Sequence, residues 1–496
     1  MVDKQLLDFV SDQQEKGVPN ANISSALLTQ GWQQNQIQEA FNSLTTTPSL
    51  PPKRSGKKIL VKIILATLLL IILLVVFAYS YLPIMGFFAK DVSPINDHDL
   101  IISPDVVPNE QNAFYVLVKL KYPSVYSSKS DFINDPKQWN DNAVKDELAK
   151  NSQLLALFDE ALSKPYFQNP IFVDTGFQTP DSLGDPSKKI DPFEILKLSK
   201  VVELKAQLLL RQGKDKEALE ESLKIVDLGQ KMTQTQPSLI DYLTALGLKR
   251  IGLDAAQRIV TSSKLSTSDI LLKIAFLEKY KSKTEGLENS FRGEYLFVKG
   301  SINYVEKEAD TALKKLAEES NNRSTVKTYN KFTFQPNRSR ETAYNFYKQA
   351  VTDAGLNCYV LKDYKALQTT DISPMPILML KENSIGSILT HALISVVDVP
   401  KQIQKRCDDL VNVSVTQTLF ALKAFKIDNN KLPENLTELV PKYVSTVPVD
   451  PYSNGPLLYQ HSKAILYSTG VKGIDVGGST GDDWTKMENP TFRINF

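Results

Sequence analysis

Hydrophobic residues recur at every third or fourth position over much of the chain, which is the spacing of one face of an α-helix. Near the N-terminus this spacing predicts three short helices within residues 4–44, with Gly17 and Gly31 at the ends of the first two. Together they would bury one small core, formed by Leu6, Leu7, Phe9, Val10, Ile23, Leu27, Leu28, Trp32, Ile37, Ala40, Phe41 and Leu44. We therefore expect a separate three-helix module over residues 1–45.

The apolar pattern then becomes continuous in one stretch. Between Ile63 and Ala78 the only residue that is not apolar is Thr67. About 20 apolar residues suffice for a helix to cross a hydrocarbon core about 30 Å thick. The alternative, a cleaved signal peptide, lacks a small-residue cleavage site here and would follow a folded module. The pattern predicts one transmembrane helix over 58–82, preceded by a Pro/Ser-containing linker over 46–57.

The charges on the two sides of this stretch differ in sign. The residues before it are basic: Lys53, Arg54, Lys57, Lys58 and Lys62. The residues after it are mainly acidic: Lys90, Asp91, Asp97 and Asp99. Because positive charge stays on the cytoplasmic side, we expect a single-pass protein of the cell membrane, bound to lipid, with its N-terminus in the cytoplasm. Its larger C-terminal part would then be extracytoplasmic.

Helical spacing returns over residues 95–407. Two amphipathic helices joined at Gly213 resemble a tetratricopeptide-type hairpin, and further helices are predicted over 237–263, 267–282 and 284–318. Helix pairs of this kind stack into a solenoid. No fixed repeat period is found, so an irregular helical bundle is an equal alternative.

The last segment, residues 408–496, mixes helical and alternating patterns. A helix is predicted over 408–428, and the side chains on its apolar face are Val415, Leu419, Leu422 and Phe425. The expected elements after it are a short helix near 435–443, antiparallel strands over 456–460 and 464–468, and an edge strand from the final "PTFRINF". The fold class expected for the whole chain is mainly α, with a C-terminal α+β module.

The net charge and the cysteine count of the chain limit the classes of partner and of site that we expect. The chain has 496 residues, with 58 basic and 56 acidic side chains and a net charge of +2. No global field would attract nucleic acid, so we expect no nucleic-acid partner. The two cysteines, Cys358 and Cys407, form no metal-binding pattern. Either they form a disulfide or they lie apart.

No hydrolase, kinase or oxidoreductase motif is present, and no cofactor is expected. The histidines, His98, His391 and His461, are far apart in the sequence. Candidate charged groups are Arg292 with Glu294, and Asn337, Arg338 and Arg340, which structural ion pairs or helix caps explain as well as catalysis does. Ser339 is expected to cap a helix at its N-terminus, and Asp450 to form an Asx-type turn.

Two segments resemble known families. The stretches "LLTQGW" and "IQEAF" resemble ubiquitin-associated-like three-helix modules. The C-terminal segment resembles the soluble domains of type II secretion pseudopilins at Phe425, Asp428, Asn429, Asn430, Pro433, Leu436, Leu439, Pro441, Tyr443, Pro448, Asp450, Pro451, Asn454, Gly455, Tyr459, Tyr467, Ser468 and Gly470. The combination resembles a group of uncharacterised bacterial single-pass membrane proteins.

The pseudopilin resemblance implies an assembly module and calcium bound in the acidic glycine loop. The residues that would hold calcium are Asp475, Asp482 and Asp483, although their spacing is not that of an EF-hand, and a solvated acidic loop is the alternative. In pseudopilins the membrane helix runs directly into this segment, whereas here a long helical region separates the two. We therefore expect a non-enzymatic, membrane-anchored scaffold of the bacterial cell envelope, linked to a secretion or pilus-like assembly. The alternative is an extracytoplasmic hydrolase that uses acidic residues.

Overall fold

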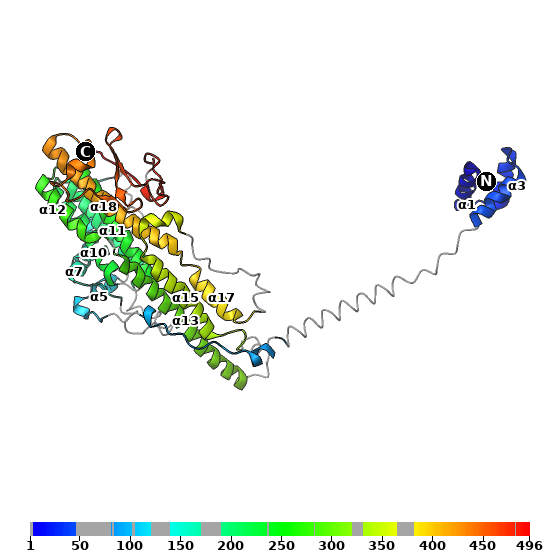
Figure 1. The fold of residues 1–496 in the computed structure, drawn as a ribbon, viewed down its shortest axis with the longest axis horizontal. Helices are drawn as coiled ribbons and strands as arrows, with labels where there is room; N and C mark the ends of the chain where they lie inside the picture. Colours follow the sequence, from blue (N-terminus) through cyan, green and yellow to red (C-terminus); the bar gives the residue numbers. More distant parts are fainter. Residues whose placement is uncertain are drawn as a thin grey trace. The chain divides into compact units, whose positions relative to one another are not determined.

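The computed structural model describes residues 3–45, 81, 84–101, 105–120, 139–169, 190–235, 238–281, 283–319, 331–364, 381–481 and 483–496. The chain divides into two compact units, residues 1–80 and 81–496 (Figure 1).

The first unit contains the predicted three-helix module. Its helices are α1 (Lys4–Glu15), α2 (Asn20–Thr29) and α3 (Gln34–Thr45). The buried core residues are Leu6, Val10, Ile23, Leu27, Ile37, Ala40 and Phe41. Leu28 was predicted to join them but is 46% exposed. Trp32 packs against this core, so its role in the module is structural.

The prediction of a transmembrane helix over 58–82 is corrected. No helix in the described part of the chain is both long enough and apolar enough to cross a bilayer. Within 58–82 only Tyr81 is described, and the rest of the predicted helix lies outside the described residues. The long helices that are described have charged side chains at intervals of a few residues, a pattern typical of helices that pack on one face in water. The single-pass topology and the membrane location, which rested on that helix, are not retained.

The second unit is mainly helical. Its α-helices are α5 (Phe114–Leu117), α6 (Asp141–Lys150), α7 (Ser152–Ser163), α9 (Pro192–Arg211), α10 (Asp215–Thr235), α11 (Leu239–Ser262), α12 (Thr267–Leu277), α13 (Thr284–Glu319), α15 (Pro336–Ala354), α17 (Ser384–Ile394) and α18 (Val399–Asn429). Its 3₁₀ turns are η1 (His98–Leu100), η2 (Asn109–Gln111), η3 (Val118–Leu120), η8 (Glu278–Tyr280), η9 (Cys358–Asp363), η10 (Leu436–Leu439), η11 (His461–Lys463) and η12 (Trp484–Lys486). Figure 1 shows α13, α15 and α17 side by side, and α11 and α12 beside α18.

The predicted hairpin at Gly213 is present as α9 and α10, and α11 packs against both. Gly213 has φ +74°, a left-handed conformation that glycine adopts without strain. Between α10 and α11 the backbones come close at Gly252, where an added Cβ would lie 2.7 Å from the carbonyl oxygen of Ser222. Small residues therefore set the distance between these two helices.

Helix α18 lies at the centre of the unit and packs against α11, α12, α13 and α15. It begins at Val399 and so crosses the boundary predicted between residues 407 and 408. Val415, Leu419, Leu422 and Phe425 are buried as predicted, but nearly every residue from Val411 to Phe425 is also buried. The helix is therefore surrounded by neighbours, whereas the sequence predicted one apolar face against a sheet.

The C-terminal segment forms two small antiparallel sheets. One pairs β1 (Val449–Asp450) with β2 (Gly455–Pro456), and the other has the order β3–β4–β5, from Leu458–Gln460, Ile465–Tyr467 and Thr491–Arg493. Tyr459 pairs with Leu466, as the predicted hairpin requires, and Leu466 pairs with Phe492 of the predicted terminal edge strand. Phe492 and Ile494 belong to the same hydrophobic core as the long helices.

Candidate functional site

A buried ion pair joins α11 to α18. The Nζ atom of Lys249 donates to Oδ2 of Asp409 over 2.6 Å, and to the carbonyl oxygen of Tyr280 over 2.6 Å. The Lys249 side chain is fully buried, and that burial lowers its pKa while the Asp409 carboxylate acts in the opposite direction. An unpaired charge here would be costly, so the pair fixes the position of one helix relative to the other.

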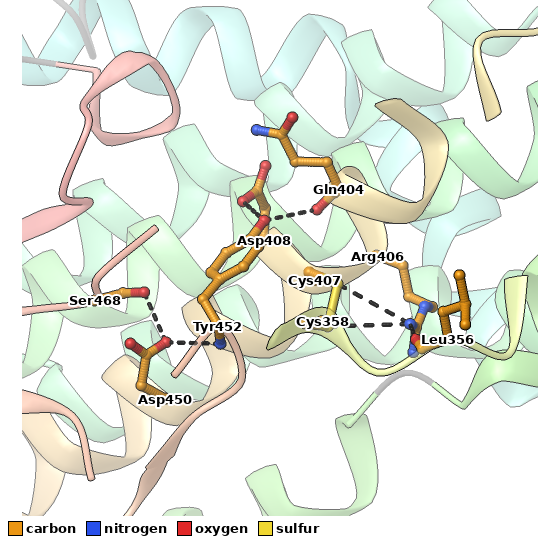
Figure 2. Close-up of a disulfide and its surroundings, with 9 residues drawn as sticks. All are labelled: Leu356, Cys358, Gln404, Arg406, Cys407, Asp408, Asp450, Tyr452 and Ser468. Atoms are coloured by element: carbon orange, nitrogen blue, oxygen red, sulfur yellow. Dashed lines mark hydrogen bonds between the residues drawn. A yellow bond between two sulfur atoms is a disulfide. The ribbon is translucent and has the colours of Figure 1, made fainter. Parts of the chain in front are cut away.

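The preceding residue, Asp408, links α18 to the C-terminal segment. Figure 2 shows Tyr452 reaching Asp408, and its hydroxyl donates to Oδ1 over 2.6 Å. That hydroxyl also lies 3.2 Å from the carbonyl oxygen of Gln404. Burial raises the pKa of Asp408 to about 6, although the Tyr452 hydrogen bond lowers it. The second carboxylate oxygen of Asp408 has no hydrogen-bond partner among the described residues.

Asp450 forms the predicted turn and has no accessible surface. Its carboxylate accepts hydrogen bonds from the backbone N–H of Tyr452 (3.1 Å) and from the Ser468 hydroxyl (2.7 Å). It also accepts from the backbone N–H (2.9 Å) and the hydroxyl (3.0 Å) of Thr469. Four donors to one carboxylate satisfy its oxygens, so Asp450 serves as a structural anchor between β1 and the residues after β4.

A disulfide lies on the other side of α18. Cys358 in η9 and Cys407 in α18 are bonded, with their Cα atoms 5.7 Å apart, which decides between the two alternatives left by the sequence. The Nη2 atom of Arg406 donates to the carbonyl oxygen of Leu356 and lies 4.0 Å from each sulfur atom (Figure 2). The covalent bond therefore holds η9 against the central helix beside a buried guanidinium.

Between α11, α18 and η12 the structure contains a cavity of about 350 Å³, which we call the α11–α18 cavity. Its apolar wall consists of Leu243, Leu246 and the Trp484 ring. Its remaining lining residues are Gly247, Arg250, Lys401, Gln404, Lys405, Asp408, Asp409, Asn412 and Thr485. One apolar wall that faces several converging polar groups is typical of a site for a small ligand.

The three cations of the α11–α18 cavity differ in their pairing. Arg250 lies over the Trp484 ring, 5.5 Å from its centroid, and donates to Asp483 over 2.9 Å. Lys401 and Lys405 have no acidic partner within ion-pair distance among the residues that the structure describes. Partial burial lowers the pKa of Lys405, and the neighbouring Lys401 lowers it further. The cavity thus holds positive charge that the described protein leaves without a direct partner.

A second cavity of about 540 Å³ lies beside the first, and Trp484 lines both. Its lining is more polar and includes Arg258, whose guanidinium donates to Glu203. Asp254 also lines it, and burial raises the pKa of that carboxyl. Arg493 is the third charged residue of this lining, and no described acidic side chain lies within ion-pair distance of it.

The predicted calcium residues are only partly described. Asp475 accepts a hydrogen bond from the backbone N–H of Gly477, and Asp483 pairs with Arg250 and accepts from Thr485. Asp482 lies outside the described residues. The described residues include no group of three or more side chains placed to hold a metal ion. Calcium at Asp475, Asp482 and Asp483 stays a prediction.

The charged pair predicted at Arg292 and Glu294 is separated by the fold. Arg292 donates to Asn289 over 2.9 Å, whereas Glu294 accepts from the backbone N–H of Leu239 over 3.1 Å at the start of α11. Burial raises the pKa of Glu294, and the nearby Asp241 raises it further. Each residue therefore has a structural partner of its own.

The prediction that Ser339 caps a helix is wrong. Helix α15 begins at Pro336, three residues earlier, and the buried Ser339 hydroxyl donates to the carbonyl oxygen of Gln335. The carboxylate of Asp91 accepts instead from the backbone N–H groups of Asn337 (2.7 Å) and Arg338 (3.1 Å). A cap supplied from a distant part of the chain leaves no local signal in the sequence.

The remaining candidate catalytic residues form ion pairs or lie in separate elements. Arg338 pairs with Glu382, and Arg340 pairs with Glu306. The histidines lie in three different elements: His98 in η1, His391 in α17 and His461 in η11. Catalysis by these groups therefore has no geometric support among the described residues.

Sequence reasoning missed the residues of the α11–α18 cavity. The signal lay in "KQIQKRCDDL", where Lys401, Lys405 and Asp408 recur at helical spacing inside a segment that also buries apolar residues. Charges on a buried helix indicate internal pairs or a cavity. Lys249, the partner of the adjacent Asp409, lies far away in the sequence, so that ion pair could not be predicted.

Comparison with protein-family models, with curated proteins and with solved structures found no match to this chain.

Proposed function

We propose that this chain is a non-enzymatic interaction protein whose second unit presents a rigid loop to a protein partner. The loop comprises residues 471–478 and follows β4. It exposes two β-branched apolar side chains, Ile474 (55% exposed) and Val476 (50% exposed). Exposed apolar side chains at a fixed position favour contact with a partner, because binding removes them from water.

The loop is fixed by Asn489, which has no accessible surface. Its Nδ2 atom donates to the carbonyl oxygens of Ile474 (2.8 Å) and Thr469 (3.0 Å), and its Oδ1 atom accepts from the backbone N–H of Val476 (2.8 Å). The turn at Asp475 adds a bond from the Gly477 N–H over 2.8 Å. A loop already held in one conformation loses little entropy on binding, which favours affinity.

Two further considerations support an interaction protein over a hydrolase. Two of the carboxylates considered for a hydrolase are engaged: Asp450 accepts four hydrogen bonds and Asp483 pairs with Arg250. The resemblance of residues 408–496 to pseudopilin soluble domains agrees with an assembly role. From that resemblance we infer only that the segment assembles with other proteins.

The test uses the full chain as bait to capture proteins from cell extract. It compares the wild type with a variant of the loop and with a control variant. The double variant Ile474→Ser/Val476→Ser should keep the wild-type melting temperature, because about half of each residue's surface is already exposed to water. It should lose proteins that the wild-type chain captures from cell extract, as measured by quantitative mass spectrometry. With a purified partner, the loss should be about 10-fold or more in Kd.

The matched control is Leu272→Ser in α12, which removes an apolar side chain that is 68% exposed away from the loop. This variant should capture the same proteins as the wild type. The proposal fails if the loop variant and the control capture the same set, or if no protein is captured above an empty support.

A further inference from the structure

We propose that the α11–α18 cavity binds a zwitterionic small molecule, an α-amino acid or a dipeptide with an apolar side chain. This inference goes beyond the proposed function, because the cavity and the loop 471–478 share no residue. It rests on three features of the lining: cations without direct partners, a carboxylate with a free oxygen, and an apolar wall.

The cations would hold the ligand carboxylate. Lys401 and Lys405 are one helical turn apart on α18 and both line the cavity. Asp398 at the start of α18 partly offsets the charge of Lys405 but forms no ion pair with it. The side-chain amide of Gln404 lies between the two lysines in the sequence and has no described hydrogen-bond partner. These three side chains offer donors of the kind that a carboxylate accepts.

The cation of the ligand would meet Asp408. One oxygen of this carboxylate accepts from Tyr452, and the other has no partner among the described residues while the side chain lines the cavity. Lys405 and Asp408 are three residues apart, so their side chains are neighbours on one helix face. A ligand that contacts both needs its positive and negative groups close together, as they are in an amino acid.

The size and the apolar wall restrict the rest of the ligand. A volume of about 350 Å³ is near the lower end for ligand sites, which suits one or two amino-acid residues. Leu243, Leu246 and the Trp484 ring would cover an apolar side chain.

The Trp484 side chain contributes its ring to the apolar wall. It is 9% exposed, and its indole Nε1 atom is buried with no hydrogen-bond partner in the described structure. Buried donors are normally paired, and an unpaired one is destabilising. This nitrogen has almost no accessible surface, so a ligand in the cavity would contact the indole ring and not its N–H group.

The test uses isothermal titration calorimetry on the full chain with leucine, the dipeptide Ala-Leu, leucinamide and N-acetyl-leucine. Leucinamide lacks the carboxylate and N-acetyl-leucine lacks the ammonium group, while both keep the apolar side chain. We expect saturable binding of leucine or Ala-Leu, about 10-fold or more tighter than either analogue. Whichever of leucine and Ala-Leu binds more tightly shows whether the cavity takes a free amino acid or a dipeptide.

Three variants test which side chain binds each charged group of the ligand. Lys405→Met should weaken the zwitterion about 10-fold without weakening the cation leucinamide, whereas Asp408→Asn should weaken the zwitterion without weakening the anion N-acetyl-leucine. Asp408→Asn keeps an oxygen that accepts from Tyr452, so the fold is retained. Lys431→Met, an exposed lysine just after α18, should bind as the wild type does.

Equal binding of zwitterion and analogues would overturn the proposal, as would unchanged affinity in Lys405→Met. The same holds if neither leucine nor Ala-Leu shows saturable binding up to about 10 mM, a range in which even a millimolar site is detected. A melting temperature within the wild-type range confirms that each variant is folded.

Discussion

Buried ionisable side chains in this protein differ in how far their charge is compensated. Lys249 and Asp409 neutralise each other, and Asp450 is satisfied by neutral donors. Asp241 is less well compensated: it lies near the start of α11 with Asn169 as its side-chain donor, 3.3 Å away. Such a group opposes folding in its charged form, so it links stability to pH.

Asp241→Asn should reduce that pH dependence. Burial raises the pKa of Asp241 to about 6, so the folded state favours the protonated form. The stability that this provides is present in full below about pH 4 and is lost as pH rises through about 6. The variant should therefore match the wild type near pH 4 and be more stable by about 2–3 kcal/mol near pH 7.5. Urea denaturation across this range measures it, and a variant less stable than the wild type at pH 7.5 would contradict this account.

Lys249→Met should be strongly destabilising, because it leaves Asp409 buried without its cation. The expected loss in free energy of unfolding is about 3–5 kcal/mol. The double variant Lys249→Met/Asp409→Leu removes both charges and should recover most of that loss. Chemical denaturation of the two variants separates the outcomes. If the double variant were as unstable as the single one, packing around Lys249 would matter more than its charge.

At the scale of elements, the disulfide between η9 and α18 crosslinks positions 49 residues apart. By the chain-entropy estimate, closing a loop of that length stabilises the fold by about 4 kcal/mol. The double variant Cys358→Ser/Cys407→Ser should lose most of this, and a reducing agent should lower the wild-type melting temperature without affecting the variant. A wild-type protein whose stability is the same with and without reductant would contradict the assignment.

Helices and strands in which apolar residues recur at a regular spacing could be predicted from the sequence. Features that depend on contacts between distant parts of the chain could not. Gly213 marks the α9–α10 turn because the apolar spacing stops on both sides of it. The pairing of Leu466 with Phe492 follows from two alternating apolar runs. The burial of α18 on all sides from Val411 to Phe425 could not be predicted from its apolar face, because polar residues such as Thr416 are buried through hydrogen bonds within their own helix. The α11–α18 cavity was missed for the same reason: it exists only where three distant segments meet.

At the scale of the whole molecule, the second unit has one main core that continues into its C-terminal segment. The same cluster of buried side chains contains Leu219 of α10, Phe291 of α13, Val415 of α18 and Phe492 of β5. Tyr452 and the Arg250–Asp483 pair add polar links between the helices and the last residues. The sequence suggested a boundary after residue 407 across which the two parts would unfold separately. A shared core favours cooperative unfolding instead.

Deletion of Phe492–Phe496 distinguishes these two expectations. It removes two of the three residues that pair with β4, and with them the buried side chains of Phe492 and Ile494, so the melting temperature should fall. In a Trp32→Phe/Trp139→Phe background, fluorescence reports only Trp484 in η12, while circular dichroism at 222 nm reports the helices. Because η12 and the long helices share one core, both signals should change in a single transition at the same lowered temperature. The loop variant Ile474→Ser/Val476→Ser is the control and should melt as the undeleted chain does. A fluorescence transition well below the helical one would instead mean that the C-terminal segment unfolds on its own, as the sequence alone had suggested.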